Sequence, residues 1–373
     1  MNIVKSILLL LLPACLLLAL NTSYAGHAAI MIDAANGSVL HEENATHSWY
    51  PASLTKVMTL YMTFDALKAG EIQLNDTLTA SAHAARQPQS KLGLRQGEKL
   101  TVQDAILAVI TRSANDAAVV LSEHLGGTEE NFAIKMTAKG HSLGMYDSHF
   151  MNATGLPHPW QVTTSRDMAV LAWKTQQNFP NYYPFFSAHT FNFKGRELHG
   201  INKFTANYPG AEGMKTGFTC GSGYNLISVA NQDGKRLIGV ILGGMTSPER
   251  YQLMIKMMNN GFANRTDANP AANINAMASN TGGKPPVQLG CGNMPQTSIG
   301  SNSTNDAYIP KAKLNRKFTH STHHTTMTPT VKKITSTRPI AKPKLTVVTK
   351  SKIKPNKPKK IEQVNKTRYH HPK

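Results

Sequence analysis

The chain has 373 residues, and its formal net charge of +19 is unevenly distributed. Residues 267–373 hold 19 Lys and Arg against 3 Asp and Glu, whereas residues 1–266 carry a net charge of only +3. This distribution excludes a basic nucleic-acid-binding core, because the excess charge lies outside the part that can fold. Three cysteines in a chain of this length also exclude a disulfide-stapled miniprotein.

The N-terminus has the order of a secretory signal peptide. Lys5 precedes 14 apolar residues at 7–20, and Ser23 and Ala25 follow at small-x-small spacing. The apolar run is shorter than the ~18 residues that span a bilayer. We therefore expect residues 1–25 to be removed and the mature protein to lie in the periplasm or cell envelope. In that oxidising setting Cys220 and Cys291 can pair, but spacing alone does not determine whether they do.

The mature chain begins and ends its folded part with strands. Strands are predicted at 28–32 and 38–41, joined by Asn36-Gly37, and later at 190–193, 213–218, 224–230 and 237–243. Helices are predicted at 53–68, 102–110, 117–125, 131–143, 165–174 and 248–262. Strands at both ends with helices between them predict an α/β (α+β) domain at 26–266. Its antiparallel sheet is flanked by helices, and its first and last strands are neighbours.

The last third of the chain has a different composition. Residues 267–373 are rich in Ser, Asn, Pro and Lys and show no apolar periodicity, so we expect a disordered basic tail. The block at 352–360 is Lys-rich and Pro-interrupted. It is expected either to bind anionic envelope polymers or a membrane surface, or to act as a solvated linker without a specific partner.

The first candidate for chemistry is Ser53-Leu54-Thr55-Lys56 at the start of a predicted helix. Positions i and i+3 share a helix face, so the Ser53 hydroxyl and the Lys56 amine can meet. A serine nucleophile needs an adjacent base, and a lysine serves as one when burial or a neighbouring cation lowers its pKa. Taken alone, the motif is also compatible with an N-cap serine and an exposed lysine.

Two further short motifs follow in the chain. Ser113-Ala114-Asn115 lies between two predicted helices, where a hydroxyl can relay a proton and a carboxamide can bind an amide. Lys215-Thr216-Gly217 lies on a predicted strand, where Lys215 and Thr216 can hold a carboxylate. Gly217 has no side chain to keep a substrate backbone away from the strand. Each motif alone is compatible with an ordinary helix cap or strand end.

The three motifs together, in this order, resemble the penicillin-recognising serine enzymes. The segments PASLTKVMT (51–59), NATGLP (152–157), TSRDMA (164–169) and GYNL (223–226) resemble the low-molecular-mass penicillin-binding proteins that are D-alanyl-D-alanine carboxypeptidases. The resemblance covers about residues 27–265 and implies a β-lactamase/transpeptidase-like fold. It also implies a serine-type enzyme that removes the terminal D-alanine from peptidoglycan stem peptides and is acylated by β-lactam antibiotics.

The resemblance also implies roles for individual residues. Ser53 is the acylated nucleophile, Lys56 its general base and Ser113 a proton relay. Asn115 contacts the substrate amide, and the backbone N–H groups of Ser53 and Phe218 form the oxyanion hole.

The carboxylate of the terminal D-alanine is assigned to Lys215 and Thr216. Arg250, in the turn at the start of the last helix, matches an arginine common near this site in the family. The resemblance implies no cofactor and no metal, and the sequence contains neither a His-Glu-x-x-His motif nor a compact Cys/His ligand set.

Two alternatives stay open at this point. A D,D-endopeptidase that cuts peptidoglycan cross-links would use the same machinery. A non-catalytic wall-binding scaffold would rely on the basic tail, although the intact motifs argue against it. A β-lactamase is less consistent with the sequence, because no Glu-x-x-Leu-Asn motif follows the second motif. A nucleic-acid partner is not expected for an exported tail.

Overall fold

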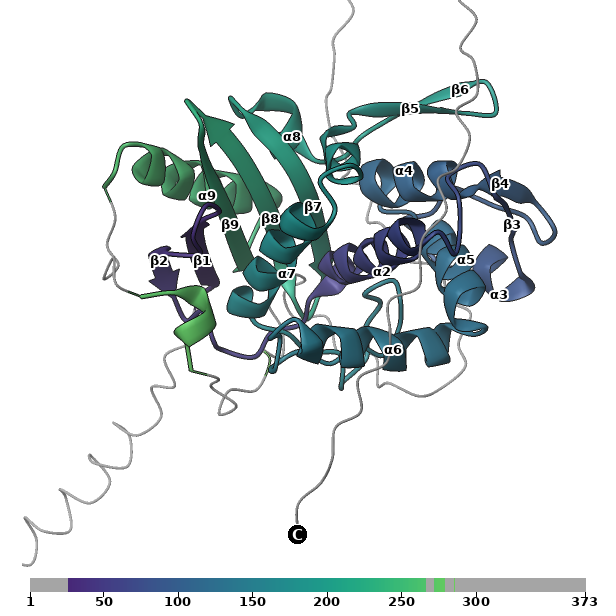
Figure 1. Cartoon of the computed structure of the whole chain (residues 1–373), viewed down its shortest axis with the longest axis horizontal. Coiled ribbons are helices and arrows are strands. Elements are labelled where there is room, and N and C mark those ends of the chain that lie inside the picture. Colours follow the sequence, from purple (N-terminus) through teal and green to yellow (C-terminus); the bar gives the residue numbers. More distant parts are fainter. Residues whose placement is uncertain (1–25, 266–271, 279–284, 286–373) are drawn as a thin grey trace, which may run out of the picture. The chain divides into compact units, whose positions relative to one another are not determined.

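The computed structural model describes residues 26–265, 272–278 and 285 (Figure 1). The predicted signal peptide and most of the predicted tail lie outside the described residues, as does Cys291. Cys220 is disulfide-bonded.

The helices are α2 (Thr55–Ala69), α3 (Ala82–Ala85), α4 (Val102–Arg112), α5 (Asn115–Gly126), α6 (Glu129–Ser142), α7 (Ser165–Asn178), α8 (Lys203–Asn207) and α9 (Ser247–Phe262), and 3₁₀ turns lie at Ala52–Leu54, Tyr183–Ser187 and Ile274–Ala276.

Five strands form the main antiparallel sheet in the order β2-β1-β9-β8-β7. They are β1 (Ala28–Asp33), β2 (Val39–Glu43), β7 (Ala211–Thr219), β8 (Gly223–Gln232) and β9 (Lys235–Gly244). Ile30 of β1 lies opposite Val240 of β9, so the first and last strands are neighbours, as predicted. The hairpin predicted from Asn36-Gly37 is present, and β8 and β9 form a second hairpin around Asp233-Gly234.

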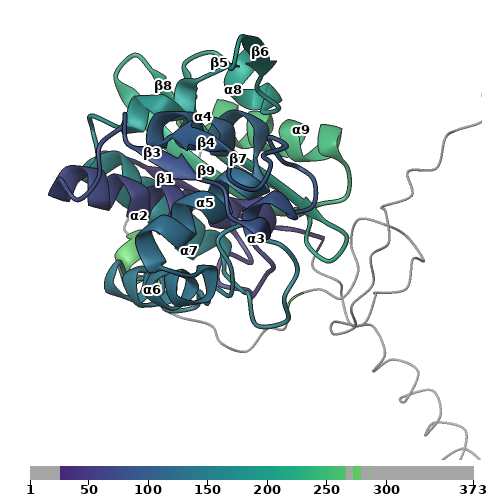
Figure 2. The same cartoon turned by 90° about the vertical axis from the view of Figure 1, so that its right-hand side faces the viewer.

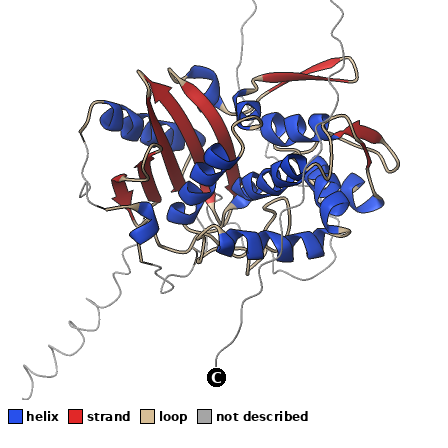
Figure 3. Ribbon diagram, viewed as in Figure 1, coloured by secondary structure: helices blue, strands red, loops and turns tan. Residues whose placement is uncertain are grey.

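Helices cover both faces of this sheet (Figure 3). Because successive strand residues point to opposite faces, Ala29 and Met31 of β1 belong to a core cluster with α9, whereas Ile30 and Ile32 belong to the larger core. Helix α7 packs on that second face. The predicted α/β class with a helix-flanked antiparallel sheet is confirmed.

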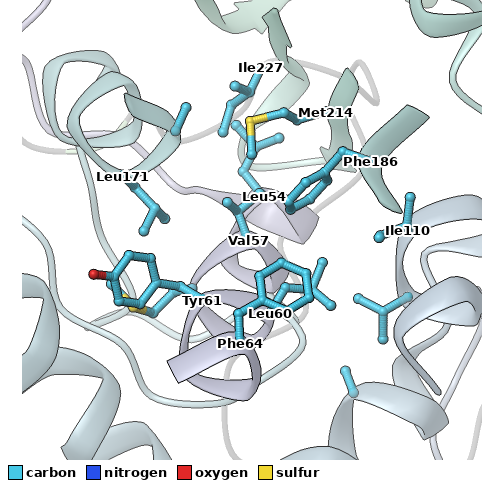
Figure 4. Close-up of a cluster of buried hydrophobic side chains, with 14 of the residues drawn as sticks. Leu54, Val57, Leu60, Tyr61, Phe64, Ile110, Leu171, Phe186, Met214 and Ile227 are labelled. Atoms are coloured by element: carbon cyan, nitrogen blue, oxygen red, sulfur yellow. The ribbon is translucent and has the colours of Figure 1, made fainter. Parts of the chain in front are cut away.

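Helix α2 lies inside the molecule and positions the candidate site. Figure 4 shows its apolar residues Val57, Leu60 and Phe64, and Leu54 just before the helix, surrounded by side chains from the sheet and from neighbouring helices. A helix that packs on all sides is buried, and α2 buries even the polar residue Lys56. The sequence therefore places a lysine where water does not reach it.

Several features of the structure differ from the sequence predictions. Ser53 lies in a 3₁₀ turn directly before α2 rather than in the α-helix itself. Strand β5 (Thr190–Phe193) pairs with β6 (Arg196–His199) in a separate hairpin instead of joining the main sheet. Residues 71–100 contain α3 and a second small pair, β3 (Thr77–Thr79) with β4 (Lys99–Thr101). Figure 2 looks onto this helical side, where α5 packs against α4 and α6.

The expectation of disorder from residue 267 is wrong for residues 272–278. Asn273 forms a β-bridge with Ser38, and Ile274 is fully buried in the large core. The carbonyl of Ile274 accepts hydrogen bonds from Nε and an NH₂ nitrogen of Arg166 at 3.2 and 3.1 Å. One buried apolar residue and a few backbone hydrogen bonds hold the segment, so its composition gave no sign of it. No helix in the described ranges is long and apolar enough to cross a membrane.

Candidate active site

The Ser53 turn has an unusual backbone that its neighbours hold in place. Ala52 has a φ of +47°, a left-handed conformation that residues with a Cβ seldom adopt. Asn225 of β8 is buried, and its Nδ2 donates to the carbonyls of Tyr50 and Pro51 at 2.9 and 3.1 Å. Its Oδ1 accepts from the N–H of Gly243 at 2.9 Å. Asn225 thus fastens the segment before Ser53 to the sheet.

Two glycines allow the close packing of this turn. A Cβ on Gly155 would lie 1.8 Å from the carbonyl oxygen of Ala52, and Gly155 has a φ of +83°. A Cβ on Gly217 would lie 3.0 Å from the backbone nitrogen of Ser53. Strand β7 and the 152–157 loop can therefore approach the turn only without side chains at these positions. Sequence reasoning assigned Gly217 to substrate approach, and the structure adds that it lets the sheet reach Ser53.

Lys56 is fully buried, and its amine lies 2.9 Å from Ser53 Oγ. The amine also donates to the Thr154 carbonyl at 2.5 Å. Burial lowers the pKa of Lys56 well below its usual value, and the charge of Lys215 lowers it further, whereas Glu129 and Asp116 act in the opposite direction. A neutral amine keeps a lone pair, so Lys56 can accept the Ser53 proton while an N–H stays bonded to Thr154.

A second hydroxyl–amine pair connects the second motif with the third. Ser113, which caps α4 with a φ of +54°, has its Oγ 2.8 Å from the amine of Lys215. Lys215 is buried and also donates to the Thr216 carbonyl at 2.8 Å. Burial first, and then the charge of Arg250, lowers the pKa of Lys215 to about 7. The Lys215 amine can therefore gain or lose a proton near neutral pH.

A cleft of about 410 Å³ opens onto these groups. Its lining comes from the Ser53 turn, the loop at 89–90, the start of α5, the end of β7 and neighbouring segments: Ser53, Gln89, Ser90, Ser113, Asn115, Gly155, Leu156, Ile201, Thr216, Gly217, Phe218, Thr219, Tyr224 and Arg250. Both hydroxyls thus face the cleft. Lys56 and Lys215 are buried behind them and are absent from this lining.

Most of the predicted substrate-binding residues line the cleft, but some also have structural partners. Asn115 Nδ2 donates to the carbonyl of Pro88 at 2.9 Å, so this side chain also holds the loop that forms one wall. Phe218 is partly exposed and stacks on Tyr224 with ring centroids 4.2 Å apart. Lys215, expected to hold a carboxylate directly, instead points its amine at Ser113.

Arg250 is largely buried at the edge of the cleft. Its guanidinium lies over the rings of Tyr224 and Tyr251 at 5.5 and 4.6 Å. One terminal nitrogen donates to the carbonyl of Gly217 at 3.3 Å, which ties the end of β7 to the start of α9. A guanidinium at this position gives the cleft a positive charge suited to a carboxylate.

Sequence reasoning missed several residues that build the site. Asn225 and Gly155 were used only as parts of matching segments, and Glu129 and Asp116 were not singled out. Asp116 follows Asn115 and accepts the N–H groups of Leu92, Gly93 and Leu94 at 2.9, 2.7 and 3.0 Å. A buried acidic residue next to a predicted helix start is the one signal that pointed to it. In the described ranges no group of three or more His, Cys, Asp or Glu is placed to hold a metal ion.

The geometry defines a class of enzyme. A serine activated by a buried lysine, with a second serine–lysine pair on the same cleft and an antiparallel sheet beside it, is the arrangement of penicillin-recognising acyl-transfer enzymes. A family model described as D-alanyl-D-alanine carboxypeptidase matches residues 19–246. The chain therefore belongs to the D-alanyl-D-alanine carboxypeptidase family, a family of serine hydrolases, and the family predicted from the motifs is confirmed.

Similar curated proteins carry the same description. D-alanyl-D-alanine carboxypeptidase DacC of Escherichia coli is 34% identical over 287 residues, which span 74% of this chain and 72% of DacC. D-alanyl-D-alanine carboxypeptidase DacF of Bacillus subtilis is 32% identical over 246 residues, 65% of this chain and 63% of DacF. The chain thus matches somewhat less than two thirds of the length of DacF.

Solved structures share the fold. Penicillin-binding protein 5 of Haemophilus influenzae is 33% identical with a TM-score of 0.62, over 64% of this chain and 71% of that one. Penicillin-binding protein D2 of Listeria monocytogenes in its cefotaxime-bound form is 31% identical with a TM-score of 0.59. That match covers 65% of this chain and 99% of the Listeria chain, so the shared part is the domain described above. The predicted transpeptidase-like fold is confirmed.

Proposed function

We propose that this protein is a serine-type D-Ala-D-Ala carboxypeptidase of peptidoglycan stem peptides. The observation that carries the proposal is the buried Lys56 amine, 2.9 Å from the hydroxyl of Ser53. This pair provides an activated nucleophile on the wall of a cleft large enough for a peptide terminus. The substrate class, peptides that end in D-Ala-D-Ala, is inferred from the family to which the chain belongs.

The reaction would proceed through an acyl-enzyme. Ser53 Oγ attacks the carbonyl carbon of the penultimate D-alanine while Lys56 accepts the hydroxyl proton. The negative oxygen of the tetrahedral intermediate would face the backbone N–H groups of Ser53 and Phe218. The C–N bond then breaks, and the departing amine of the terminal D-alanine receives a proton through Ser113, backed by Lys215. Transfer of the proton from Lys56 to Lys215 would return both amines to their starting states. Lys56 would then deprotonate the water that hydrolyses the ester and give that proton to the departing Ser53 oxygen.

The substrate carboxylate is assigned to the end of the cleft formed by β7. Thr216 lines it, Arg250 lies at its edge, and Lys215 contributes positive charge from behind when protonated. The amide of the stem peptide is assigned to the side chain of Asn115. Beta-lactams are expected to acylate Ser53, in line with the cefotaxime- and ampicillin-bound forms of the Listeria relative.

Product analysis by mass spectrometry tests the proposal. The mature protein is incubated with pentapeptide monomers and cross-linked dimers, and Ser53→Ala serves as the control. We expect release of one alanine from the monomers, no release by Ser53→Ala, and circular dichroism unchanged in that variant. Conversion of dimers to monomers instead would move the assignment to an endopeptidase. No change in either substrate would leave the non-catalytic wall-binding scaffold as the remaining interpretation.

Enzymes of this family act on the cell wall, outside the cytoplasm. We further propose that residues 1–25 direct export and that the basic tail binds anionic envelope polymers. Because residues 272–278 pack into the domain, the test removes residues 279–373 and not the whole region from 267. We expect unchanged turnover of a soluble peptide, weaker retention on cell envelopes, and a difference that shrinks at high salt. Equal retention of both chains would exclude an electrostatic tail.

A further inference from the structure

Glu129 is a buried carboxylate that the proposed mechanism does not use. It is the first residue of α6, and only 8% of its side chain is exposed. One carboxylate oxygen accepts the backbone N–H of Ala153 at 2.9 Å. The other lies 2.7 Å from Nε2 of His83, whose side chain is 45% exposed. A charged group of this kind is seldom buried without a role for its charge or its hydrogen bonds.

The hydrogen bonds lead from Glu129 to the general base. Ala153 precedes Thr154, and the Thr154 carbonyl receives the hydrogen bond of the Lys56 amine. On its other side, the Ala153 carbonyl accepts from the Thr59 hydroxyl at 2.7 Å. Glu129 and Thr59 therefore hold the two backbone groups of the same residue, Ala153, directly before Thr154. This fixes the direction of the carbonyl that orients Lys56 toward Ser53.

Glu129 also acts on Lys56 through its charge. The charged groups that act on Lys56 are Lys215 from β7, Asp116 from α5 and Glu129 from α6. The Asp116 carboxylate is engaged by three backbone N–H groups of the 92–94 loop. Glu129 has only one such bond, and its second oxygen faces a histidine.

The other charged groups near Glu129 come from its own helix and from α3 and α5. Glu130, its neighbour on α6, is exposed. Glu123 of α5 accepts a hydrogen bond from Ser81 at 2.9 Å. His83 of α3, with Nε2 2.7 Å from the Glu129 carboxylate, is therefore the group that pairs with this charge.

We propose that Glu129 is a positioning residue for the general base: it holds the Thr154 carbonyl against the Lys56 amine and, through its charge and its pair with His83, sets the acidic edge of the active pH range. The inference rests on the proposed role of Lys56. A negative charge favours the protonated amine. Removing that charge should therefore let Lys56 act as a base at lower pH. Removing His83 should have the opposite effect, because the Glu129 carboxylate then loses its side-chain partner.

The test is the rate of acylation by a fluorescent penicillin, measured from about pH 4 to pH 9. Glu129→Gln keeps an oxygen for Ala153 and an amide for His83 but removes the charge. We expect its acidic limb to shift down by roughly one pH unit, with a plateau rate within a few-fold of the parent. Glu130→Gln is the matched control, since it makes the same change at the adjacent exposed position. We expect it to leave the profile unchanged.

A second variant keeps the result decisive if Glu129→Gln folds poorly. His83→Gln retains a donor for Glu129, and its acidic limb should move to higher pH. Superimposable profiles for both variants and the parent, or a uniform fall in rate at every pH, would overturn the inference. Failure of the parent protein to be acylated on Ser53 at any pH would instead overturn the proposed function, so the two failures are distinguishable.

Discussion

The sheet with α9 differs from the surroundings of Ser53 in its backbone conformations and in the side chains that it buries. In the sheet, strands and tight turns are those that local sequence predicts, and β1 packs Met31 on one face and Ile32 on the other. Around Ser53, residues other than glycine adopt positive φ, at Ala52 and Ser113. Charged side chains are also buried there: Lys56, Asp116, Glu129, Lys215 and Arg250.

The difference shows where this domain gives up stability for chemistry. Burying a charge costs several kcal/mol unless partners compensate, and a left-handed alanine or serine costs about 1–3 kcal/mol. The regular sheet and its apolar contacts stabilise the folded domain enough to offset these costs. Substitutions around Ser53 should therefore alter activity first. Substitutions at sheet positions away from the cleft should alter stability only.

The largest effect is expected at Gly155. In Gly155→Ala the new Cβ would meet the carbonyl oxygen of Ala52, which is backbone and cannot rotate away. The Ser53 turn must shift, and a displacement of about 1 Å at reacting groups costs roughly 100-fold in rate. We expect penicillin acylation to fall by about that factor or more, measured by stopped-flow fluorescence.

Gly239 on β9 is the matched control from the sheet side. A Cβ there would meet Sδ of Met254 and Cε of Met257 and Met258, the ends of flexible side chains. Gly239→Ala should keep the parent acylation rate and lose about 1–2 kcal/mol of stability. Equal losses of rate in the two variants would remove the contrast between the two regions.

The next effect concerns the returning segment at 272–278. A chain ending at residue 271 loses the burial of Ile274 and the two hydrogen bonds from the Arg166 guanidinium to the Ile274 carbonyl. We expect it to be about 2–4 kcal/mol less stable to urea than a chain ending at residue 278. Penicillin acylation of the folded protein should be similar, because Ile274 lies outside the cleft. Identical urea midpoints would show that the segment does not contribute.

A smaller effect should appear in the pH dependence of stability. The pKa of Lys215 is about 7 in the folded protein and near 10.5 when exposed. Between these values the unfolded chain binds more protons, so the free energy of unfolding rises with pH. In Lys215→Met this contribution is absent. Urea unfolding at about pH 7, 8 and 9 should therefore show a flatter rise in the variant, and parallel slopes would contradict the assigned pKa.

Much of this molecule was predictable from local patterns. The hairpin at Asn36-Gly37 and the pairing of the first and last strands both agree with the sequence prediction. The Ser53–Lys56 contact was also predictable, because i and i+3 are adjacent on any helix. In these cases the information lies within a few residues, or in a pattern that repeats along the chain.

The sequence alone determined which residues are the candidates for the chemistry and the order in which the chain presents them. Only the tertiary structure decided why they work together. Thr154 reaches Lys56 across 98 positions of the chain, and Lys215 reaches Ser113 across 102. Glu129 and Ile274 owe their roles to burial beside partners that lie far away along the chain. Such contacts depend on how whole helices pack against the sheet, and the low pKa values of the lysines arise only when that packing excludes water.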